Sequence, residues 1–368
     1  MEPLAAGVLG CGNISDAYLR GNDRFESYEV VACADIDVDR TREKAEEYGL
    51  EAYDPEGLLA EESIDLLINL TPPSAHAETC RDVLDAGKHV YVEKPMAASS
   101  ADADAIVAAA DREGLLVGSA PDTFLGAGLQ TCRSVLDDGR IGEPVGATAI
   151  WASGGHESWH PHPEIFYAEG GGPMFDMGPY YVTALAALLG PAVRVSGATA
   201  RTHAERTITT EARRGETIGV NPDIPTHESA IVEFANGAVA TVMTSFDTPG
   251  GSTFPAPVFE LYGTEGTLSL PDPNHFEGSV EVHRSGEDPE TVPLTHEYTG
   301  GRGAGVADLA RAARSDWSQR ANVTFARHVF GILAGVRESS EGRGSVRLEP
   351  DADRPEPLPT GFPDDRRD

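Results

Sequence analysis

The stretch Leu4-Ala-Ala-Gly-Val-Leu-Gly-Cys-Gly-Asn-Ile-Ser15 decides the fold of this chain. Its first six residues form an apolar strand, glycines follow at positions 10 and 12, and a helical stretch begins at Ser15. Gly10 permits a tight turn, and Gly12 lets a pyrophosphate group approach the backbone at the helix amino terminus. Ser15 replaces the third glycine of this pattern with another small residue. The glycines alone are a weak indication, because an ordinary strand–turn–helix can carry them.

A second strand strengthens the prediction. Residues 28–34 form another apolar run, and Asp35 ends it, 25 positions after Gly10. An acid at this place accepts hydrogen bonds from both hydroxyls of an adenosine ribose and repels a 2′-phosphate. Strand, glycines and acid together predict NAD as the cofactor. NADP is the alternative, since Arg40 and Arg42 lie close by and an arginine accommodates a 2′-phosphate.

Strands and helices continue to alternate up to about residue 120. The apolar runs lie at residues 64–70, 89–92 and 115–119. One helix between them is expected to be capped by Ser74, and another covers residues 101–112. The alternation predicts a parallel, doubly wound Rossmann sheet over residues 1–122. The loops that follow its strands then share one edge, where ligands of such sheets bind.

The triplet Glu93-Lys94-Pro95 follows one of these strands. Lys94 is one of only three lysines in the chain, although arginine is plentiful. Lysine is rare in this chain, yet one lies at the carboxyl end of a buried strand. This placement indicates that an ammonium is needed there. The alternative is a surface lysine before a turn proline.

The second half has a different pattern. A helix is expected over residues 125–136, and apolar strands at 229–234, 238–245 and 258–262 are joined by turns rich in Gly, Asn and Asp. This pattern predicts an α+β domain over residues 123–348 with a mainly antiparallel open sheet. Residues 199–226 form a polar, loop-like stretch. Residues 349–368 contain five prolines and are expected to be a loose tail.

The charge balance excludes several classes of partner. Sixty acidic residues against 28 basic ones give a formal charge of −32, spread along the chain. Such a surface opposes binding to nucleic acids and to anionic membranes. Together with the shortage of lysine, it favours a halophilic protein in a cytosol of molar salt, where the Debye length falls to roughly 3 Å.

Four cysteines without a C-x-x-C spacing are expected to be small core residues in a reducing compartment. The sequence shows no signal peptide and no apolar run of membrane-spanning length. We therefore expect a soluble, cytoplasmic protein.

In combination these segments resemble the Gfo/Idh/MocA family, which includes glucose–fructose oxidoreductase and inositol 2-dehydrogenase. The resemblance extends from residue 4 to about 348. The matching segments are 10–15, Asp35, Thr71-Pro-Pro-Ser-Ala-His76, 86–95, Ile141-Gly-Glu-Pro144, Gly170-Gly-Gly-Pro-Met-Phe-Asp-Met-Gly-Pro-Tyr180 and 262–268.

The resemblance implies an NAD(P)-dependent oxidoreductase acting on a sugar, sugar acid or polyol, with Lys94 catalytic and the Lys94–Pro95 peptide often cis. It implies these cofactor-binding residues: Gly10, Gly12, Asn13, Ile14, Asp35, Thr71, Pro72, His76, Glu93 and Lys94. We also expect a homo-oligomer, a dimer or tetramer, formed through the C-terminal sheet. No metal is expected.

The chain departs from the family pattern in two places. Many members carry histidine four residues after the aspartate of the glycine-rich motif, where this chain has Tyr180. Glucose–fructose oxidoreductase uses tyrosine there, so the change selects a subgroup. Many members also have an Asn/Arg-containing segment where this chain reads Ala120-Pro-Asp-Thr-Phe124, which leaves the contacts near the nicotinamide open.

Oxidising a hydroxyl sends a hydride to the nicotinamide and a proton to a base. Tyr180 is the expected base, activated by the ammonium of Lys94, which could instead bind the substrate oxygen directly. Asp176 lies four residues before Tyr180 and is expected on the same helical face, in a catalytic or substrate-binding role. The alternative is that Asp176 only caps that helix. Tyr181 should point elsewhere.

Three histidines lie between residues 156 and 162. Zinc binding is disfavoured, because prolines stiffen the segment and no cysteine joins it. We expect a loop that lines the sugar pocket, with Trp159 as a stacking face and His160 as a hydrogen-bonding group. Packing of these rings for structure alone is the competing interpretation.

Two other functions remain open on this fold. Some relatives keep NAD bound and cleave glycosidic bonds through transient oxidation, and others are non-catalytic sensors of sugar or NAD. The presence of both Lys94 and Tyr180 argues against a sensor.

Overall fold

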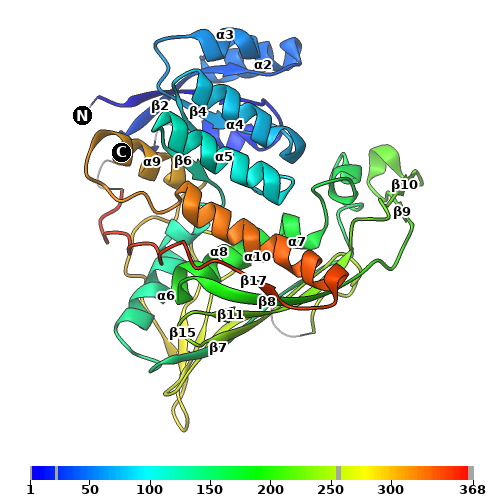
Figure 1. Ribbon diagram of the computed structural model, residues 1–368, viewed down its shortest axis with the longest axis vertical. Coiled ribbons are helices and arrows are strands. Elements are labelled where there is room, and N and C mark those ends of the chain that lie inside the picture. Colours follow the sequence, from blue (N-terminus) through cyan, green and yellow to red (C-terminus); the bar gives the residue numbers. More distant parts are fainter. Residues whose placement is uncertain (1, 21–23, 254–257, 364–368) are drawn as a thin grey trace.

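The computed structural model describes residues 2–20, 24–253 and 258–363 (Figure 1). The first half forms a six-stranded parallel sheet in the order β3-β2-β1-β4-β5-β6. Its strands are β1 (Leu4–Leu9), β2 (Tyr28–Ala34), β3 (Glu51–Tyr53), β4 (Leu66–Asn69), β5 (His89–Val92) and β6 (Val117–Ser119). The predicted Rossmann sheet is confirmed. The reversal of strand order beside β1 is the place where such sheets bind dinucleotides.

Helices cover both faces of this sheet: α1 (Ser15–Leu19), α2 (Val38–Tyr48), α3 (Pro55–Ala60), α4 (His76–Asp85) and α5 (Ser100–Glu113). Local signals explain several ends. The side chain of Asp37 caps α2, that of Ser99 caps α5, and Gly49 and Gly114 end the two helices with left-handed backbone. The expected cap by Ser74 is wrong, because Ser74 lies inside a 3₁₀ turn and α4 begins only at His76.

The second half is built on a nine-stranded sheet in the order β16-β15-β14-β13-β7-β12-β11-β8-β17. The strands are β7 (Pro144–Ala152), β8 (Ala192–Ala200), β11 (His227–Phe234), β12 (Val239–Ser245), β13 (Val258–Gly263), β14 (Thr267–Ser269), β15 (Glu281–His283), β16 (Glu290–Thr291) and β17 (Val346–Arg347). Apart from the parallel pair β7–β12, the pairs between these strands are antiparallel, as predicted.

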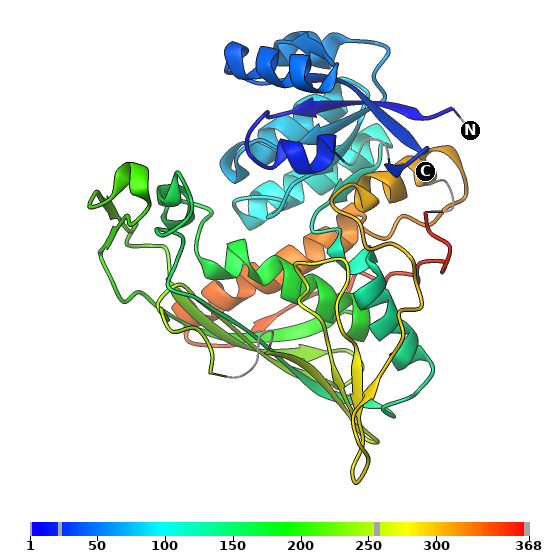
Figure 2. The same cartoon turned by 180° about the vertical axis from the view of Figure 1, so that it is seen from behind.

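One face of this sheet is covered by helices and the other is not (Figure 2). The covering helices include α6 (Ala127–Asp137), α8 (Gly178–Leu189) and α10 (Val323–Gly342). Burial alternates along β11 accordingly: Ala230, Val232 and Phe234 are buried, whereas Ile231 between them is exposed.

The chain returns to the first sheet after completing the second. Helix α9 (Ala304–Arg314) lies beside β5 and β6, and the backbone N–H of Ser119 donates to the carbonyl of Ala321 at 3.1 Å. The loop before α9 reaches the carboxyl edge of the parallel sheet, because the N–H of Gly303 donates at 2.9 Å to the carboxylate of Asp122, which follows β6.

Two segments are more ordered than expected. The polar stretch 199–226 contains a hairpin, β9 (Glu205–Thr207) paired with β10 (Thr217–Gly219), whose Ile208 and Ile218 are buried. The expectation of a loose tail is wrong for its described part, because Leu358 and Phe362 are buried in the core. Residues 364–368 lie outside the described residues. No described helix is long and apolar enough to cross a membrane.

Candidate active site

The glycine turn lies between β1 and α1, where the sequence predicts it. Gly10 has φ +98°, and a Cβ there would lie 2.7 Å from the carbonyl oxygen of Leu70, so only glycine fits between the ends of β1 and β4. A Cβ at Gly12 would meet nothing within 4 Å, so its outer face is open. The Asp35 carboxylate accepts the N–H of Cys11 at 2.7 Å, and Arg40 lies 3.5 Å from it. This open turn beside a fixed acid fits a dinucleotide.

Two of the expected cofactor-binding residues also hold the neighbouring loops together. His76 is fully buried, and its ring nitrogens lie 2.8 Å from the carbonyl of Pro95 and 2.7 Å from that of Thr71. The Glu93 carboxylate accepts from the Tyr18 hydroxyl of α1 at 2.8 Å. His76 therefore joins the loops that follow β4 and β5, and Glu93 joins the second of these loops to helix α1. The Lys94–Pro95 peptide is cis, as the resemblance implied.

Lys94 is anchored by Asp176, which ends the short helix α7 (Pro173–Asp176). The Lys94 ammonium donates to the Asp176 carbonyl at 2.8 Å and to its carboxylate at 3.0 Å. His156 Nε2 lies 2.8 Å from the other carboxylate oxygen. The capping interpretation of Asp176 is wrong, because α8 begins at Gly178 with Met177 in the N-cap position.

Lys94 and Asp176 keep each other charged, because their opposite charges lie close together. Burial disfavours the charged form of Lys94, but Asp176, with Tyr180 and Glu93, outweighs it and raises the pKa of the ammonium. Burial also disfavours the charge of Asp176, yet Lys94 and His156 lower the pKa of its carboxyl to about 2. Lysine and aspartate thus form an ion pair across the pH range in which enzymes work.

The hydroxyl of Tyr180 faces a cation that the sequence did not reveal. Arg302, in the loop before α9, donates from Nη2 to the Tyr180 hydroxyl at 2.9 Å. Asp122, which is 0% exposed, stands 3.5 Å from the other guanidinium nitrogen. The Lys94 ammonium lies over the Tyr180 ring, 5.1 Å from its centroid. Tyr180 therefore lies between two cations, and its hydrogen-bond donor is Arg302.

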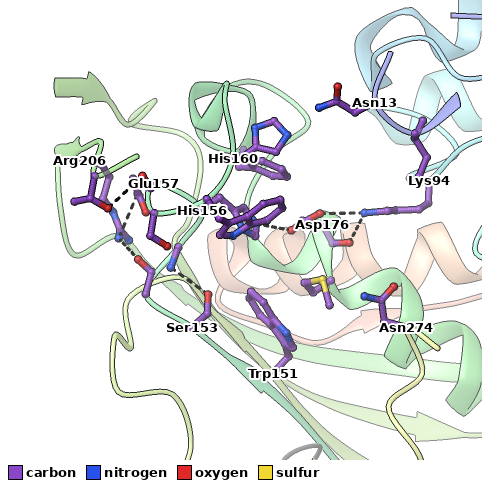
Figure 3. Close-up of a pocket in the computed structure, with 18 of the residues that line it drawn as sticks. Asn13, Lys94, Trp151, Ser153, His156, Glu157, His160, Asp176, Arg206 and Asn274 are labelled. Carbon is purple, nitrogen blue, oxygen red and sulfur yellow. Dashed lines mark hydrogen bonds and ion pairs between the residues drawn. The ribbon is translucent and has the colours of Figure 1, made fainter. Parts of the chain in front are cut away.

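Lys94, Asp176 and Tyr180 face a cavity of about 1180 Å³ between the two sheets (Figure 3). Of the expected site residues, these line it: Asn13, Ile14, Thr71, His76, Glu93, Lys94, Trp159, His160, Asp176 and Tyr180. Gly10, Gly12, Asp35 and Pro72 do not; the first three form the adjacent turn at the ends of β1 and β2. Tyr181 points away and packs against Phe259, as expected.

The histidine segment lines this cavity, but its members differ in role. His156 is buried and reaches Asp176, whereas His160 lies at the cavity wall and Trp159 is 62% exposed. Sequence reasoning chose Trp159 and His160 and missed His156 as a partner of Asp176. Within residues 2–20, 24–253 and 258–363, no group of three or more His, Cys, Asp or Glu is arranged to hold a metal.

Two family models match the chain. One describes the NAD-binding Rossmann fold of an oxidoreductase family and matches residues 4–120, and the other describes the GFO/IDH/MocA C-terminal domain and matches residues 129–269. The chain belongs to the Gfo/Idh/MocA family. It is accordingly an NAD(P)-dependent oxidoreductase in a family of sugar and polyol dehydrogenases.

Individual relatives are distant. The chain is 25% identical to D-xylose 1-dehydrogenase (NADP(+)) 2 of Haloferax volcanii over 93% of its own length and 99% of that protein. It is 26% identical to D-apiose dehydrogenase of Paraburkholderia graminis over 72% of its own length and 66% of that protein. The solved structure of levoglucosan dehydrogenase with NADH and L-sorbose matches with a TM-score of 0.79 at 18% identity, covering 95% of this chain and 100% of that one. That likeness shows the fold alone.

Proposed function

We propose that this enzyme transfers hydride between nicotinamide and a neutral sugar or polyol, with Lys94, Asp176 and Tyr180 as its catalytic residues. One observation carries the proposal: the Lys94 ammonium and the Tyr180 hydroxyl face the same cavity, and each is held by a charged partner whose side chain is only 12% or 13% exposed. The geometry supports a base and an electrophilic donor acting on one substrate oxygen.

The proton path uses groups of the chain. When bound, the dinucleotide supplies the hydride acceptor. The substrate hydroxyl gives its proton to Tyr180, whose phenolate is stabilised by Arg302 and by the charge of Lys94. An ammonium has three N–H donors, and Asp176 accepts two of them. The third can bind the substrate oxygen as it becomes a carbonyl. In the reverse direction Tyr180 returns the proton.

Asp35 favours NAD over NADP in this proposal. Its carboxylate is fixed by the N–H groups of Cys11 and Asp37 at 2.7 and 2.9 Å, so it cannot easily turn away from a ribose. Arg40 offsets part of its charge at 3.5 Å, which reduces the penalty for a 2′-phosphate without removing it.

The charges of the cavity favour a neutral substrate over a sugar acid. Of the residues that the structure describes, four with carboxylates line it: Glu93, Glu157, Asp176 and Glu205. The lysine and arginine that line its described wall are Lys94 and Arg206, and both are engaged. Lys94 pairs with Asp176, and Arg206 pairs with Asp247. An anionic substrate would meet more negative than positive charge.

A substrate panel tests the proposal. Neutral aldoses, polyols and the matching aldonic acids are supplied with NAD or NADP, from dilute buffer to molar KCl, and the absorbance of reduced nicotinamide is followed. Neutral compounds should be oxidised, and Lys94→Ala should abolish the signal. Oxidation confined to the acids, or no reduction with any compound, would contradict the proposal. Conversion of a glycoside without net nicotinamide reduction would favour glycoside cleavage with bound cofactor.

We also propose that copies associate through the uncovered face of the nine-stranded sheet. Ile231 and Val239 are exposed there on neighbouring strands. Sedimentation of wild type and an Ile231→Glu/Val239→Glu double variant tests this, since only the variant should be monomeric.

A further inference from the structure

The cavity is longer than the reacting centre requires. In Figure 3, Lys94 and Asn13 lie at one end and Glu157 and Arg206 at the other, with His156 between them. The nicotinamide and the reacting hydroxyl must lie at the Lys94 end, because the glycine turn and the proton-transferring groups are there. The far end, bounded by the hairpin β9–β10, has no part in that chemistry.

The far wall is held in place by a buried ion-pair network. Arg206 pairs with Asp247 and donates to the carbonyls of Gly154 at 3.2 Å and Phe246 at 3.0 Å. The backbone N–H of Thr209 donates to the Glu157 carbonyl at 2.9 Å. Arg206 is therefore a brace that connects the hairpin to the loop containing Gly154 and to the end of β12. A wall that is already fixed is suited to ligand recognition, because binding then costs little conformational entropy in the protein.

An aromatic face borders the middle of the cavity, beside His156, between the reacting end and the far end. Trp159 is the one aromatic side chain among the large exposed hydrophobic residues of the described chain, at 62% exposure. Its indole meets the rings of His156 and His160 edge-on, with centroids 5.1 and 5.2 Å away, so its orientation is set by its neighbours. A large apolar ring left in water beside a polar cavity indicates a ligand with an apolar face.

The remaining groups define the chemistry of that ligand. Among the described residues, the far wall offers hydroxyls from Ser158, Thr207 and Thr209, which can donate and accept hydrogen bonds, and no lysine or arginine left without an acidic partner. A pyranose or furanose ring matches both features, because its C–H face is apolar and its rim carries hydroxyls.

We propose that Trp159 and the hairpin wall form a second sugar-binding subsite, so that the substrate is a neutral glycoside or oligosaccharide of at least two units. The unit next to Lys94 reacts, and the following unit stacks on Trp159. This inference rests on the proposed function, because it takes the Lys94 end of the cavity as the reacting end.

The test compares matched sugars of one and two units: glucose with cellobiose and maltose, galactose with lactose, and xylose with xylobiose, with methyl and phenyl glycosides alongside. For at least one pair, kcat/KM should be about tenfold or more higher for the longer compound. Trp159→Ala should reduce that ratio to near one, mainly through KM. Thr207→Val, on the far wall, should reduce it less.

Ile165→Ala is the matched control, since Ile165 is exposed in the same region and does not line the cavity. It should leave the ratio unchanged. If single sugars are oxidised and no longer compound is preferred, the subsite is refuted while the proposed function stands. A preference that survives in Trp159→Ala also refutes it. If no sugar of any length is oxidised, the proposed function fails and the subsite with it.

Discussion

Arg302→Gln is the most informative single substitution, because it removes a charge from Tyr180 while keeping an N–H donor. The Arg302 side chain is 13% exposed and donates to the Tyr180 hydroxyl at 2.9 Å. Its other neighbours are the buried carboxylate of Asp122 and the amide oxygen of Asn274, which accepts from Nη2 at 3.3 Å. Glutamine can reach part of this geometry but cannot stabilise a phenolate as a cation does.

The expected loss follows from the type of bond. A hydrogen bond to a charged group contributes about 1.5–3 kcal/mol net, and each 1.4 kcal/mol is a factor of ten in rate. If Tyr180 carries negative charge when it accepts the substrate proton, Arg302→Gln should lower kcat/KM for oxidation by roughly 10- to 100-fold. The pH at which oxidation reaches half its maximum should rise, because the charged donor that favours the phenolate is removed.

The assay is steady-state oxidation measured across pH, with unfolding followed separately. Burial raises the pKa of Asp122, and Arg302 opposes that rise. The variant removes that opposing charge from a buried carboxylate, so thermal melting checks that it remains folded. Arg284→Gln removes an arginine near the edge of the nine-stranded sheet, outside the cavity lining, and serves as the charge control. An unshifted pH profile with only KM changed would refute the role given to Arg302.

Four further predictions concern the site and the surface. Tyr180→Phe should keep the fold and cofactor affinity while turnover falls on the order of 10²–10⁴-fold; near-normal turnover would contradict its role as the base. Asp35→Ser should narrow the preference for NAD, measured by titrating both dinucleotides; a wild type that binds NADP more tightly would exclude the assignment. The thermal midpoint should rise with KCl towards molar concentration, because salt screens the −32 charge; a midpoint insensitive to KCl would exclude the halophile prediction. The pKa of Asp176 is about 2 in the folded protein, below its ordinary value of 3.8, so its stabilisation is present above about pH 4 and lost as pH falls through 2. The difference in unfolding free energy between wild type and Asp176→Asn should shrink by roughly 2 kcal/mol over that range, measured by urea unfolding; a constant difference would contradict it.

The sequence predicted those parts of the site whose signals are local. The glycine turn and Asp35 occupy consecutive strand ends, and their meaning depends on spacing alone. Lys94 and Asp176 are 82 positions apart, but one follows a recognisable strand and the other belongs to a family motif. The carboxyl ends of parallel strands lie at the same edge of a sheet. That rule was enough to place Lys94 beside the glycine turn.

Arg302 and Asp122 could not be found in this way. They are 180 positions apart, and they meet because the chain returns to the first sheet after the second is complete. The usable signal was the sequence Gly300-Gly-Arg-Gly303, a single cation in a turn of glycines. The hairpin β9–β10 was missed because its apolar residues are few and its order depends on the Arg206 brace, a tertiary contact without a periodic pattern.

The places of the three lysines explain why this chain keeps them. Lys44 pairs with Asp16 and Glu47, and Lys88, only 5% exposed, donates to the carbonyls of Glu61 and Ile64 at 2.7 and 2.8 Å.

Lys94 donates to the carbonyl and to one carboxylate oxygen of Asp176. Each of the three therefore has an assigned acceptor, while arginine supplies most of the positive charge elsewhere. A guanidinium is a planar fork, whereas an ammonium directs three donors from one atom. At Lys94 that difference is functional, because two donors must hold the lysine to Asp176 while a third, from the same atom, reaches a substrate oxygen.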